Sequence, residues 1–172
     1  MLDRYADKYG GVIQETDGFN GVTSAVNEPL GVIGIVAPSE FPLLGFISLV
    51  APAVVRGNAV VAIPSQTAPL AVTDLYQVLD TSDLPGGVIN IVTGHADTLS
   101  QCLSQHQDVD GIWYCGSQIG RYHVEQLAAD NMKRVYCPQS LPSLQPLSRV
   151  ASDELLREAS EVKNIWLPMG GE

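Results

Sequence analysis

Few side chains in this sequence could act as a nucleophile or bind a metal ion. Cys115 and Cys137 each end an apolar run, and no adjacent histidine or lysine is present to lower the pKa of either thiol. We therefore expect both thiols to pack in the core. The cysteines and histidines share no metal-ligand spacing, so we predict neither a metal site nor a catalytic nucleophile among them. These residues are Cys102, Cys115, Cys137, His95, His106 and His123.

The pair Gly116-Ser117 is a candidate anion-binding element. It joins an apolar run, which predicts a strand, to the helix predicted at residues 117–129. The unpaired N–H groups and the dipole at such a helix start can accept a pyrophosphate. The run from Gly116 to Gly120 is neither a nucleophile elbow nor a phosphate loop with its lysine. The alternative interpretation is a helix start that serves the fold alone.

Residues 27–64 should position these groups. Residues 30–36 are a short apolar run bounded by prolines, which predicts a strand buried on both faces. Pro42 can open a helix, a Gly-Asn pair ends it, and residues 59–63 resume the strand pattern. Ligands tend to bind beyond the carboxyl ends of such strands. Apolar positions at three- and four-residue steps predict the inner face of this helix at Leu43, Leu44, Ile47, Val50, Ala51, Val54 and Val55.

Further strands and helices alternate along the chain. Residues 68–79 predict a helix capped by Thr67, and residues 95–106 predict a polar helix with an apolar stripe of Leu99, Cys102 and Leu103. Strands are predicted at residues 88–92, 111–115 and 133–137. This alternation predicts an α/β fold with a doubly wound parallel sheet of about five strands and helices on both faces.

The two ends of the chain predict short strands outside this sheet. Residues 12–16 and 19–27 flank an Asp-Gly turn and predict a hairpin, and residues 161–167 alternate polar and apolar side chains. Residues 138–149 contain three prolines and predict an extended linker before a helix at 150–160. Residues 2–9 predict the end of a helix that begins without a cap, so we expect a piece of a longer protein.

Length and composition exclude several classes of protein. The chain has 172 residues, which suits one domain with a sizeable core. Its net charge of −10 opposes binding to nucleic acid or anionic membranes. The longest apolar stretch, residues 43–55, is shorter than the ~20 residues of a membrane span. No secretory signal is recognisable, and the odd number of cysteines favours a reduced, cytoplasmic protein.

Several sequence blocks follow one another in a familiar order. They are E-P-L-G-V-I-G-I-V-A-P-S-E-F-P-L-L at 28–44, L-V-A-P-A-V-V-R-G-N-A-V-V at 49–61, L-P-G-G-V-I-N-I-V-T-G at 84–94, H-Q-D-V-D-G-I at 106–112 and C-G-S-Q-I-G at 115–120. Together they resemble the aldehyde dehydrogenase superfamily, and most of all the truncated, non-catalytic second copy at the C-terminus of family-16 aldehyde dehydrogenases. The resemblance implies a Rossmann-like cofactor-binding domain at 28–137 and oligomerisation-arm strands at 12–27 and 161–167. Residues 138–149 would replace the catalytic domain, followed by a C-terminal helix at 150–160.

The resemblance also implies which catalytic groups to look for. The amide that donates to the developing oxyanion in the family would fall at position 40, where this chain has Glu40, and a carboxylate only accepts hydrogen bonds. The block E-L-G-G-K that carries the base would align with residues 138–142, where proline replaces the glutamate. The nucleophile motif F-x-x-x-G-Q-x-C has no counterpart. We therefore predict that the protein is not an enzyme.

Cofactor binding is a closer question. The G-S pair of the family binds the NAD pyrophosphate, which implies that role for Gly116 and Ser117. The K-P-A-E motif that holds the adenosine ribose becomes Ile63-Pro64-Ser65-Gln66, so Gln66 could bond one hydroxyl while Ile63 could not. Losing a charge-assisted contact of about 1.5 to 3 kcal/mol weakens affinity roughly tenfold to a hundredfold. We predict no bound cofactor, with a vestigial site at Gly116, Ser117 and Gln66 and weak NAD binding as the alternative.

These observations predict a structural, oligomerisation or protein-binding module beside a larger aldehyde dehydrogenase module. Strand edges with unpaired N–H and C=O groups pair with other sheets, so we expect the arm to bind a protein partner or a second copy. In isolation, self-association through strands 12–27 and 161–167 would give a homo-oligomer. Two alternatives remain: the NAD-binding half of an NAD-dependent aldehyde dehydrogenase, and a nucleotide-sensing domain without turnover.

Overall fold

A parallel sheet forms the centre of the structure. The computed structural model describes residues 10–14, 16–18, 20–138 and 149–169. The sheet has five strands in the order β5-β4-β3-β6-β7, all parallel. Their bounds are Val32–Val36 (β3), Ala59–Ile63 (β4), Ile89–Ile91 (β5), Gly111–Tyr114 (β6) and Arg134–Tyr136 (β7). This arrangement confirms the predicted α/β fold.

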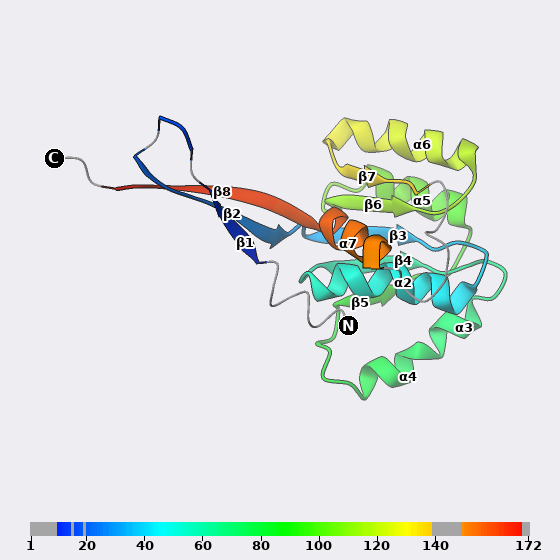
Figure 1. Ribbon diagram of the computed structural model, residues 1–172. Coiled ribbons are helices and arrows are strands. Elements are labelled where there is room, and N and C mark those ends of the chain that lie inside the picture. The colour runs from blue at the N-terminus through cyan, green and yellow to red at the C-terminus, as the bar shows by residue number, and fades with distance from the viewer. Residues whose placement is uncertain (1–9, 15, 19, 139–148, 170–172) are drawn as a thin grey trace.

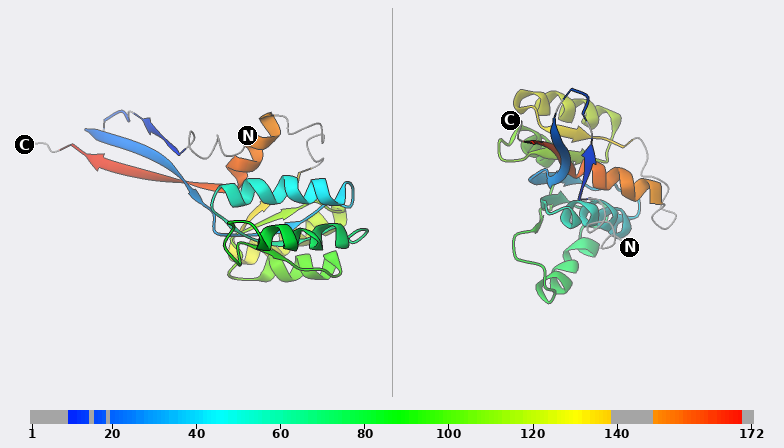
Figure 2. Two further views of the ribbon diagram at one scale, coloured as in Figure 1. Left: turned by 90° about the horizontal axis from the view of Figure 1, so that it is seen from below. Right: turned by 60° about the vertical axis from the view of Figure 1, so that its left-hand side comes forward.

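Helices cover both faces of this sheet. On one face, Phe46 and Leu49 of α2 and Leu155 of α7 pack in one core cluster with Ile33 and Ile35 of β3. On the other face, α5 and α6 pack against the opposite side of the same strands, which Figure 2 shows as a second layer. The helices are α2 (Pro42–Val55), α3 (Leu70–Thr73), α4 (Leu75–Asp80), α5 (Ala96–Gln105), α6 (Gln118–Ala128), the 3-10 turn η1 (Ala129–Asn131) and α7 (Arg149–Glu158).

Three further strands form a separate antiparallel sheet. They are β1 (Gly11–Gln14), β2 (Gly21–Pro29) and β8 (Ser160–Pro168), in the order β1-β2-β8. Residues of β2 and β8 pair along their whole length, from Gly21 opposite Pro168 to Pro29 opposite Ser160. We call these three strands the arm and the rest of the described structure the body. The arm projects from the body as a long ribbon (Figure 1). The predicted strands at both ends therefore form, whereas their role in oligomerisation stays a prediction.

The inner face of α2 differs from the prediction. Leu43, Leu44 and Ile47 were expected to face inward, but each is exposed by more than 40 %. The buried positions are Gly45, Phe46, Leu49, Val50, Pro52 and Ala53. The helix is apolar on nearly all sides, so periodicity alone does not select a face. Gly45 selects it instead, because a Cβ there would lie 2.7 Å from Pro38 Cγ, so this side of the helix approaches the loop after β3 closely.

Two other helices also depart from the prediction. The single helix expected at 68–79 is divided between α3 and α4, and Thr67 hydrogen-bonds Ser65 instead of capping the helix. In α5, Cys102 is exposed while Ser100 and Ser104 are buried. Burial of these serines is tolerated because their hydroxyls donate to helix carbonyls, Ser104 to Ser100 O at 2.7 Å and Ser100 to Asp97 O at 3.0 Å.

Two predicted segments lie outside the described residues: the helix end at 2–9 and nearly all of the linker at 138–149. The helix predicted at 150–160 matches α7, and Leu155, Leu156 and Ala159 are buried as expected. Within the ranges that the structure describes, no helix has the length and apolar character to cross a membrane.

Candidate functional site

The predicted cofactor-binding residues lie at the carboxyl edge of the parallel sheet. Gly116 and Ser117 follow β6, and Gln66 follows β4. Since β3 lies between β4 and β6, the structure places the two groups on either side of the carboxyl end of β3. Ser117 is the N-cap of α6, and its Oγ accepts a hydrogen bond from Gly120 N at 3.1 Å. The helix start that the sequence predicts is therefore present and capped.

A tyrosine that the sequence analysis did not single out shapes this helix start. Tyr114, the last residue of β6, is 4 % exposed, and its hydroxyl lies against both Gly116 and Gly120. A Cβ at either glycine would collide with the Tyr114 ring and hydroxyl. The two glycines are thus required by close packing as well as by any ligand. The signal was present in the sequence as an aromatic residue followed at two and six positions by glycine.

The opposite side of the predicted site offers little for a ribose. Gln66 already donates from Nε2 to Gly94 O at 3.3 Å, in the loop after β5. Ile63 is 1 % exposed and packs in the core with Val36 and Ile112, so its side chain contacts no ligand. Gln66 is therefore the single predicted polar contact on this side, and the residues fit a dinucleotide only in part.

The loop after β3 contains the position expected for the oxyanion-donating amide. Glu40 is exposed in this loop, and the next residue, Phe41, has a left-handed backbone with φ of 50°. For a residue with a bulky side chain this conformation is uncommon and costs about 1 kcal/mol or more. The structure therefore gives Glu40 an exposed position just before the start of α2.

The thiols at the carboxyl edge are partly shielded from solvent, which favours their protonated form. Burial raises the pKa of the Cys115 thiol to about 12, and the neighbouring Cys137 adds to the shift. Burial also raises the pKa of Cys137. A thiol that keeps its proton at neutral pH is a poor nucleophile and a poor metal ligand. In the described ranges, no group of three or more histidine, cysteine, aspartate or glutamate side chains could hold a metal ion.

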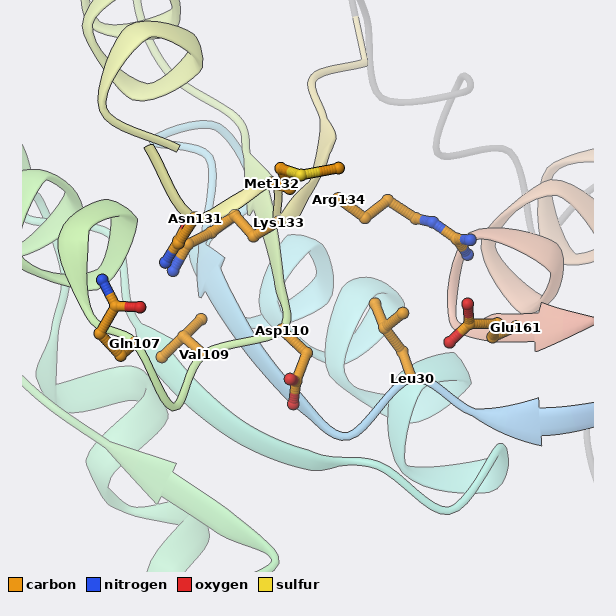
Figure 3. Close-up of a pocket in the computed structure, with 9 residues that line it drawn as sticks. All are labelled: Leu30, Gln107, Val109, Asp110, Asn131, Met132, Lys133, Arg134 and Glu161. Atoms are coloured by element: carbon orange, nitrogen blue, oxygen red, sulfur yellow. The ribbon is translucent and has the colours of Figure 1, made fainter. Parts of the chain in front are cut away.

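A pocket of about 260 Å³ lies at the opposite, amino edge of the sheet. Figure 3 shows Arg134 and Glu161 on the side nearest the arm, and Asn131 and Lys133 across the pocket from them. The sequence analysis did not predict this site, because its residues come from four separate loops and strand ends. Its lining residues are Leu30, Gln107, Val109, Asp110, Asn131, Met132, Lys133, Arg134 and Glu161.

Charged groups of this pocket hold the structure together. Asp110 Oδ2 accepts from Val32 N at 2.8 Å, and Arg134 Nη1 donates to Ser160 O at 2.6 Å. Lys133 Nζ donates to two carbonyls near the C-terminus of α5, those of Leu103 and His106, at 2.9 and 2.8 Å. Burial lowers the pKa of Lys133, although Asp110 opposes the shift. These contacts fasten strand ends and a helix end to one another, so the charged groups of the pocket have a structural role.

Comparison with known proteins identifies the family of this chain. Residues 2–138 match the model of the aldehyde dehydrogenase family. The chain belongs to this family. Among relatives, an aldehyde dehydrogenase of Agaricus bisporus is 36 % identical over 132 residues, covering 76 % of this chain and 26 % of the relative. Aldehyde dehydrogenase 1A1 of Gallus gallus is 35 % identical over 164 residues, covering 95 % of this chain and 31 % of the relative.

Solved structures agree with this family assignment. PnpE from Pseudomonas sp. WBC-3 superposes with a TM-score of 0.74 at 29 % identity, over 79 % of this chain and 28 % of that chain. Betaine aldehyde dehydrogenase from Staphylococcus aureus, solved in complex with NAD⁺, gives a TM-score of 0.74 at 27 % identity, over 79 % and 27 %. The chain therefore spans between a quarter and a third of the length of these family members.

The prediction that the protein is not an enzyme is wrong. The family is one of enzymes, and the comparisons give no sign that catalytic residues have been lost. The prediction interpreted absent motifs as lost catalytic groups. The chain, however, spans only 26 % of a relative such as the Agaricus protein. A catalytic cysteine or glutamate that belongs to another part of a family member leaves no trace in this part. The proposed loss of the groups expected near Glu40 and Pro138 therefore says nothing about the activity of a whole family protein.

Proposed function

We propose that this chain is the assembly module of an aldehyde dehydrogenase family protein, and that it joins another chain or module through the open edge of the arm. The single observation that carries the proposal is the position of β8. Of the strands that the structure describes, it is an outer one of the arm sheet, and its nine residues pair with β2 on one side and with no described strand on the other. Edge strands of this length pair readily with other sheets.

The direction of the backbone groups defines this edge. Met169 N donates to Asn20 O across the β2–β8 ladder, so odd-numbered residues of β8 direct their N–H and C=O groups toward β2. The even-numbered residues direct these groups away from β2. Val162 and Asn164 thus present N–H and C=O groups on the outer side of β8.

Side chains of the arm add apolar surface beside this edge. Among the described residues, no helix covers the arm beyond its root (Figure 1), and large apolar side chains of β1 and β8 are exposed. These side chains divide between the two faces of the arm sheet, because successive residues of a strand point to opposite faces, so each face exposes apolar surface of the kind found at interaction sites. The exposed residues are Val12, Ile13, Val162, Ile165, Trp166, Leu167 and, just after β8, Met169.

The root of the arm is held rigidly on the body by one buried side chain. Asn58, 1 % exposed, accepts from Gly31 N at 2.9 Å through Oδ1. Its Nδ2 donates to Ala53 O at 2.9 Å and to Ala159 O at 2.8 Å. Gly31 lies between β2 and β3, and Ala159 directly precedes β8. The two long strands of the arm are therefore tied to α2 where they leave the body, which orients the arm before a partner binds.

Co-expression tests this proposal. The tagged protein is produced together with an aldehyde dehydrogenase of the same source that carries the F-x-x-x-G-Q-x-C motif, and co-purification is quantified. Asn164→Pro removes an outward N–H without removing a bond to β2, whereas the control Asn164→Ser keeps that N–H. We expect equal amounts of the aldehyde dehydrogenase to co-purify with wild type and with Asn164→Ser. The amount that co-purifies with Asn164→Pro should be at least about tenfold lower. No co-purification of wild type, or an unaffected Asn164→Pro, would contradict the proposal.

NAD binding is the second candidate function. The observation that favours it is the capped start of α6 at the carboxyl edge, where a pyrophosphate could meet the N–H groups of the first turn. A family member of similar fold was solved with NAD⁺, and the contribution of Gly116, Ser117 and Gln66 in this chain is part of the proposal. On the ribose side, Ile63 stands where the family motif has lysine, so we expect low affinity for NAD⁺.

Calorimetric titration with NAD⁺ measures this second function. Gln118 is the first residue of α6, where proline keeps helical φ and removes one N–H. We expect binding in the range of about 0.1 to 1 mM for wild type, unchanged in Gln118→Ala and weakened at least about fivefold in Gln118→Pro. Absence of binding heat at about 5 mM NAD⁺, or equal affinity of both variants, would contradict a site at this helix start.

A further inference from the structure

We propose that the hydroxyl of Tyr114 donates a hydrogen bond to a phosphoryl group bound at the start of α6, and that the site recognises this group with little contribution from the rest of the ligand. The inference rests on the second candidate function, the binding of NAD⁺ at that helix start. It adds one residue to that site and one rule of specificity. The ligand class is a diphosphate anion, with or without nucleosides attached.

The Tyr114 side chain ends beneath the first turn of α6. It is 4 % exposed and packs with Val124 of this helix in the core cluster on the α5 and α6 side of the sheet. Its hydroxyl lies against Gly116, just before the helix, and Gly120, in the first turn. A Cβ at either glycine would overlap the hydroxyl, so the two glycines allow this oxygen to reach the helix start. The polar end of a buried residue is therefore directed at the proposed position of the phosphoryl group.

The Tyr114 hydroxyl has no hydrogen-bond partner among the residues that the structure describes. The other tyrosines in these ranges, Tyr76, Tyr122 and Tyr136, each form a hydrogen bond through the hydroxyl. A buried hydroxyl without a partner is unfavourable, and folded proteins seldom retain one. An acceptor oxygen from a ligand would complete the hydrogen bonding of Tyr114.

The backbone at the start of α6 suits the same ligand. The N–H of Gly120 is already bound to the side chain of the N-cap, whereas the N–H groups of Gln118 and Ile119 have no acceptor within the helix. These groups and the positive end of the helix dipole favour an anion. Arg121 brings no uncompensated charge, because the Glu125 carboxylate lies 2.7 Å from its Nε. An additional neutral donor therefore matters at this site.

The ribose side of the site offers few contacts to a nucleoside. Ile63 is 1 % exposed and packs in the core, and Gln66 Nε2 already donates to Gly94 O at 3.3 Å. A ribose would gain little from either side chain, so the phosphoryl group should supply most of the affinity. Inorganic pyrophosphate should then bind nearly as tightly as NAD⁺.

Two ligands and two tyrosine variants test the inference by calorimetric titration at a constant ionic strength of about 0.15 M. We expect NAD⁺ and inorganic pyrophosphate to bind wild type with dissociation constants within about fivefold of each other. Tyr114→Phe should weaken the binding of both ligands by a similar factor of about five to ten, because it removes one donor. Tyr122→Phe is the matched control: this exposed tyrosine of the same helix accepts from Gln126 at 2.9 Å, and its loss should leave both affinities unchanged.

Thermal unfolding separates a role in binding from a role in the fold. Without ligand, Tyr114→Phe should unfold within about 2 °C of wild type, because the hydroxyl makes no hydrogen bond that the variant would lose. With saturating pyrophosphate, the melting temperature of wild type should rise more than that of Tyr114→Phe. A large loss of stability in the ligand-free variant would assign the hydroxyl to the fold and overturn the proposal.

The remaining outcomes distinguish this inference from the second candidate function. Unchanged affinity of Tyr114→Phe for both ligands would overturn the proposed donor, and NAD⁺ binding at least about tenfold more tightly than pyrophosphate would overturn the proposed specificity. If Gln118→Pro weakens NAD⁺ binding while Tyr114→Phe does not, the inference fails and the site at the helix start remains. If neither ligand binds at about 5 mM, both fail.

Discussion

The body and the arm of this protein contain similar apolar residues but use them differently. In the body, isoleucines such as Ile33 and Ile35 are fully buried between the parallel sheet and the helices α2 and α7. In the arm, Ile13 is 75 % exposed on a sheet that no described helix covers. The body is therefore stabilised by burial of apolar surface, whereas the arm is stabilised by its ladder of hydrogen bonds and by attachment at its root.

This difference indicates a separation of roles between the two regions. A three-stranded sheet without a covering layer gains little stability of its own, and its exposed apolar side chains contribute only when something else covers them. The body already has a complete core and can act as a rigid base. Substitutions should therefore affect stability in the body and association in the arm, which the following experiments examine.

The largest expected effect compares the same substitution in the two regions. Ile35→Ala removes a fully buried side chain at the centre of the sheet and should lower the free energy of unfolding by about 3 to 4 kcal/mol. Ile13→Ala in the arm should change it by less than about 0.5 kcal/mol. Urea denaturation at low protein concentration measures both. Equal effects would show that the arm is as tightly packed as the body.

Asn58 tests whether the root of the arm depends on one side chain. Asn58→Ala leaves the Gly31 N–H and the Ala53 and Ala159 carbonyls without this partner, and it should destabilise the protein by about 3 kcal/mol. Asn90 is the matched control, since its Nδ2 also donates to two carbonyls, at 2.7 and 3.3 Å, in a more exposed setting. Asn90→Ala should cost less than about 1 kcal/mol. Similar losses in the two variants would argue against a special role for the root.

The helix start at the carboxyl edge provides a smaller test of packing in the body. Gly120→Ala brings a methyl group onto the Tyr114 hydroxyl and should cost about 2 kcal/mol. Tyr114→Phe removes the hydroxyl, so the double variant should lose less than the two single variants together. Thermal unfolding of the four proteins in this cycle measures the coupling. Strict additivity would mean that the two groups do not touch.

The smallest expected effect is a decrease in the free energy of unfolding at alkaline pH, which should arise from the body. Burial raises the pKa of Cys115 from 9.0 to about 12, so above pH 9 the unfolded chain loses this proton while the folded chain keeps it. The free energy of unfolding is unaffected by this group below pH 9 and falls as the pH rises above it, by up to about 1.4 kcal/mol per pH unit. Cys115→Ala should flatten the decline between pH 9 and 10.5, whereas the exposed-thiol variant Cys102→Ala should follow wild type. Identical slopes for all three proteins would exclude Cys115 as the cause.

Local patterns in the sequence were sufficient to predict most of the elements. The strands β3, β4 and β6 are short β-branched or aromatic runs bounded by glycine or proline, and each forms where expected. Ser117 was also placed correctly at the start of a helix, because a small polar residue after a strand is a strong N-cap signal. Gly116 was interpreted as the turn after a strand, and Gln66 was selected from its resemblance to a family motif; both follow strands in the structure, whereas their role in binding stays a prediction.

Contacts between distant segments could not be predicted in the same way. The exposed side of α2 was misplaced because Leu44 and Leu49 look alike in sequence, and only contact with the body distinguishes them. Asn58 was noted as a helix stop, yet its bonds join residues up to 101 positions away. The pocket at the amino edge was missed because Asp110 and Glu161 come together only through the fold. The activity of the family was misjudged from Glu40, since a motif search in part of a chain cannot report on the rest.

The ladder between β2 and β8 has a consequence for how the protein is made. Glu28 and Lys163, which form an ion pair across it, are separated by 135 residues. At about 5 to 20 residues per second, a ribosome needs roughly 7 to 27 seconds to produce that interval. The parallel strands β3 to β7 can be made before α7 and β8 emerge, and during this time β2 has only the short β1 as a neighbour. During this delay the edge of β2 that will pair with β8 is open to pairing with other strands.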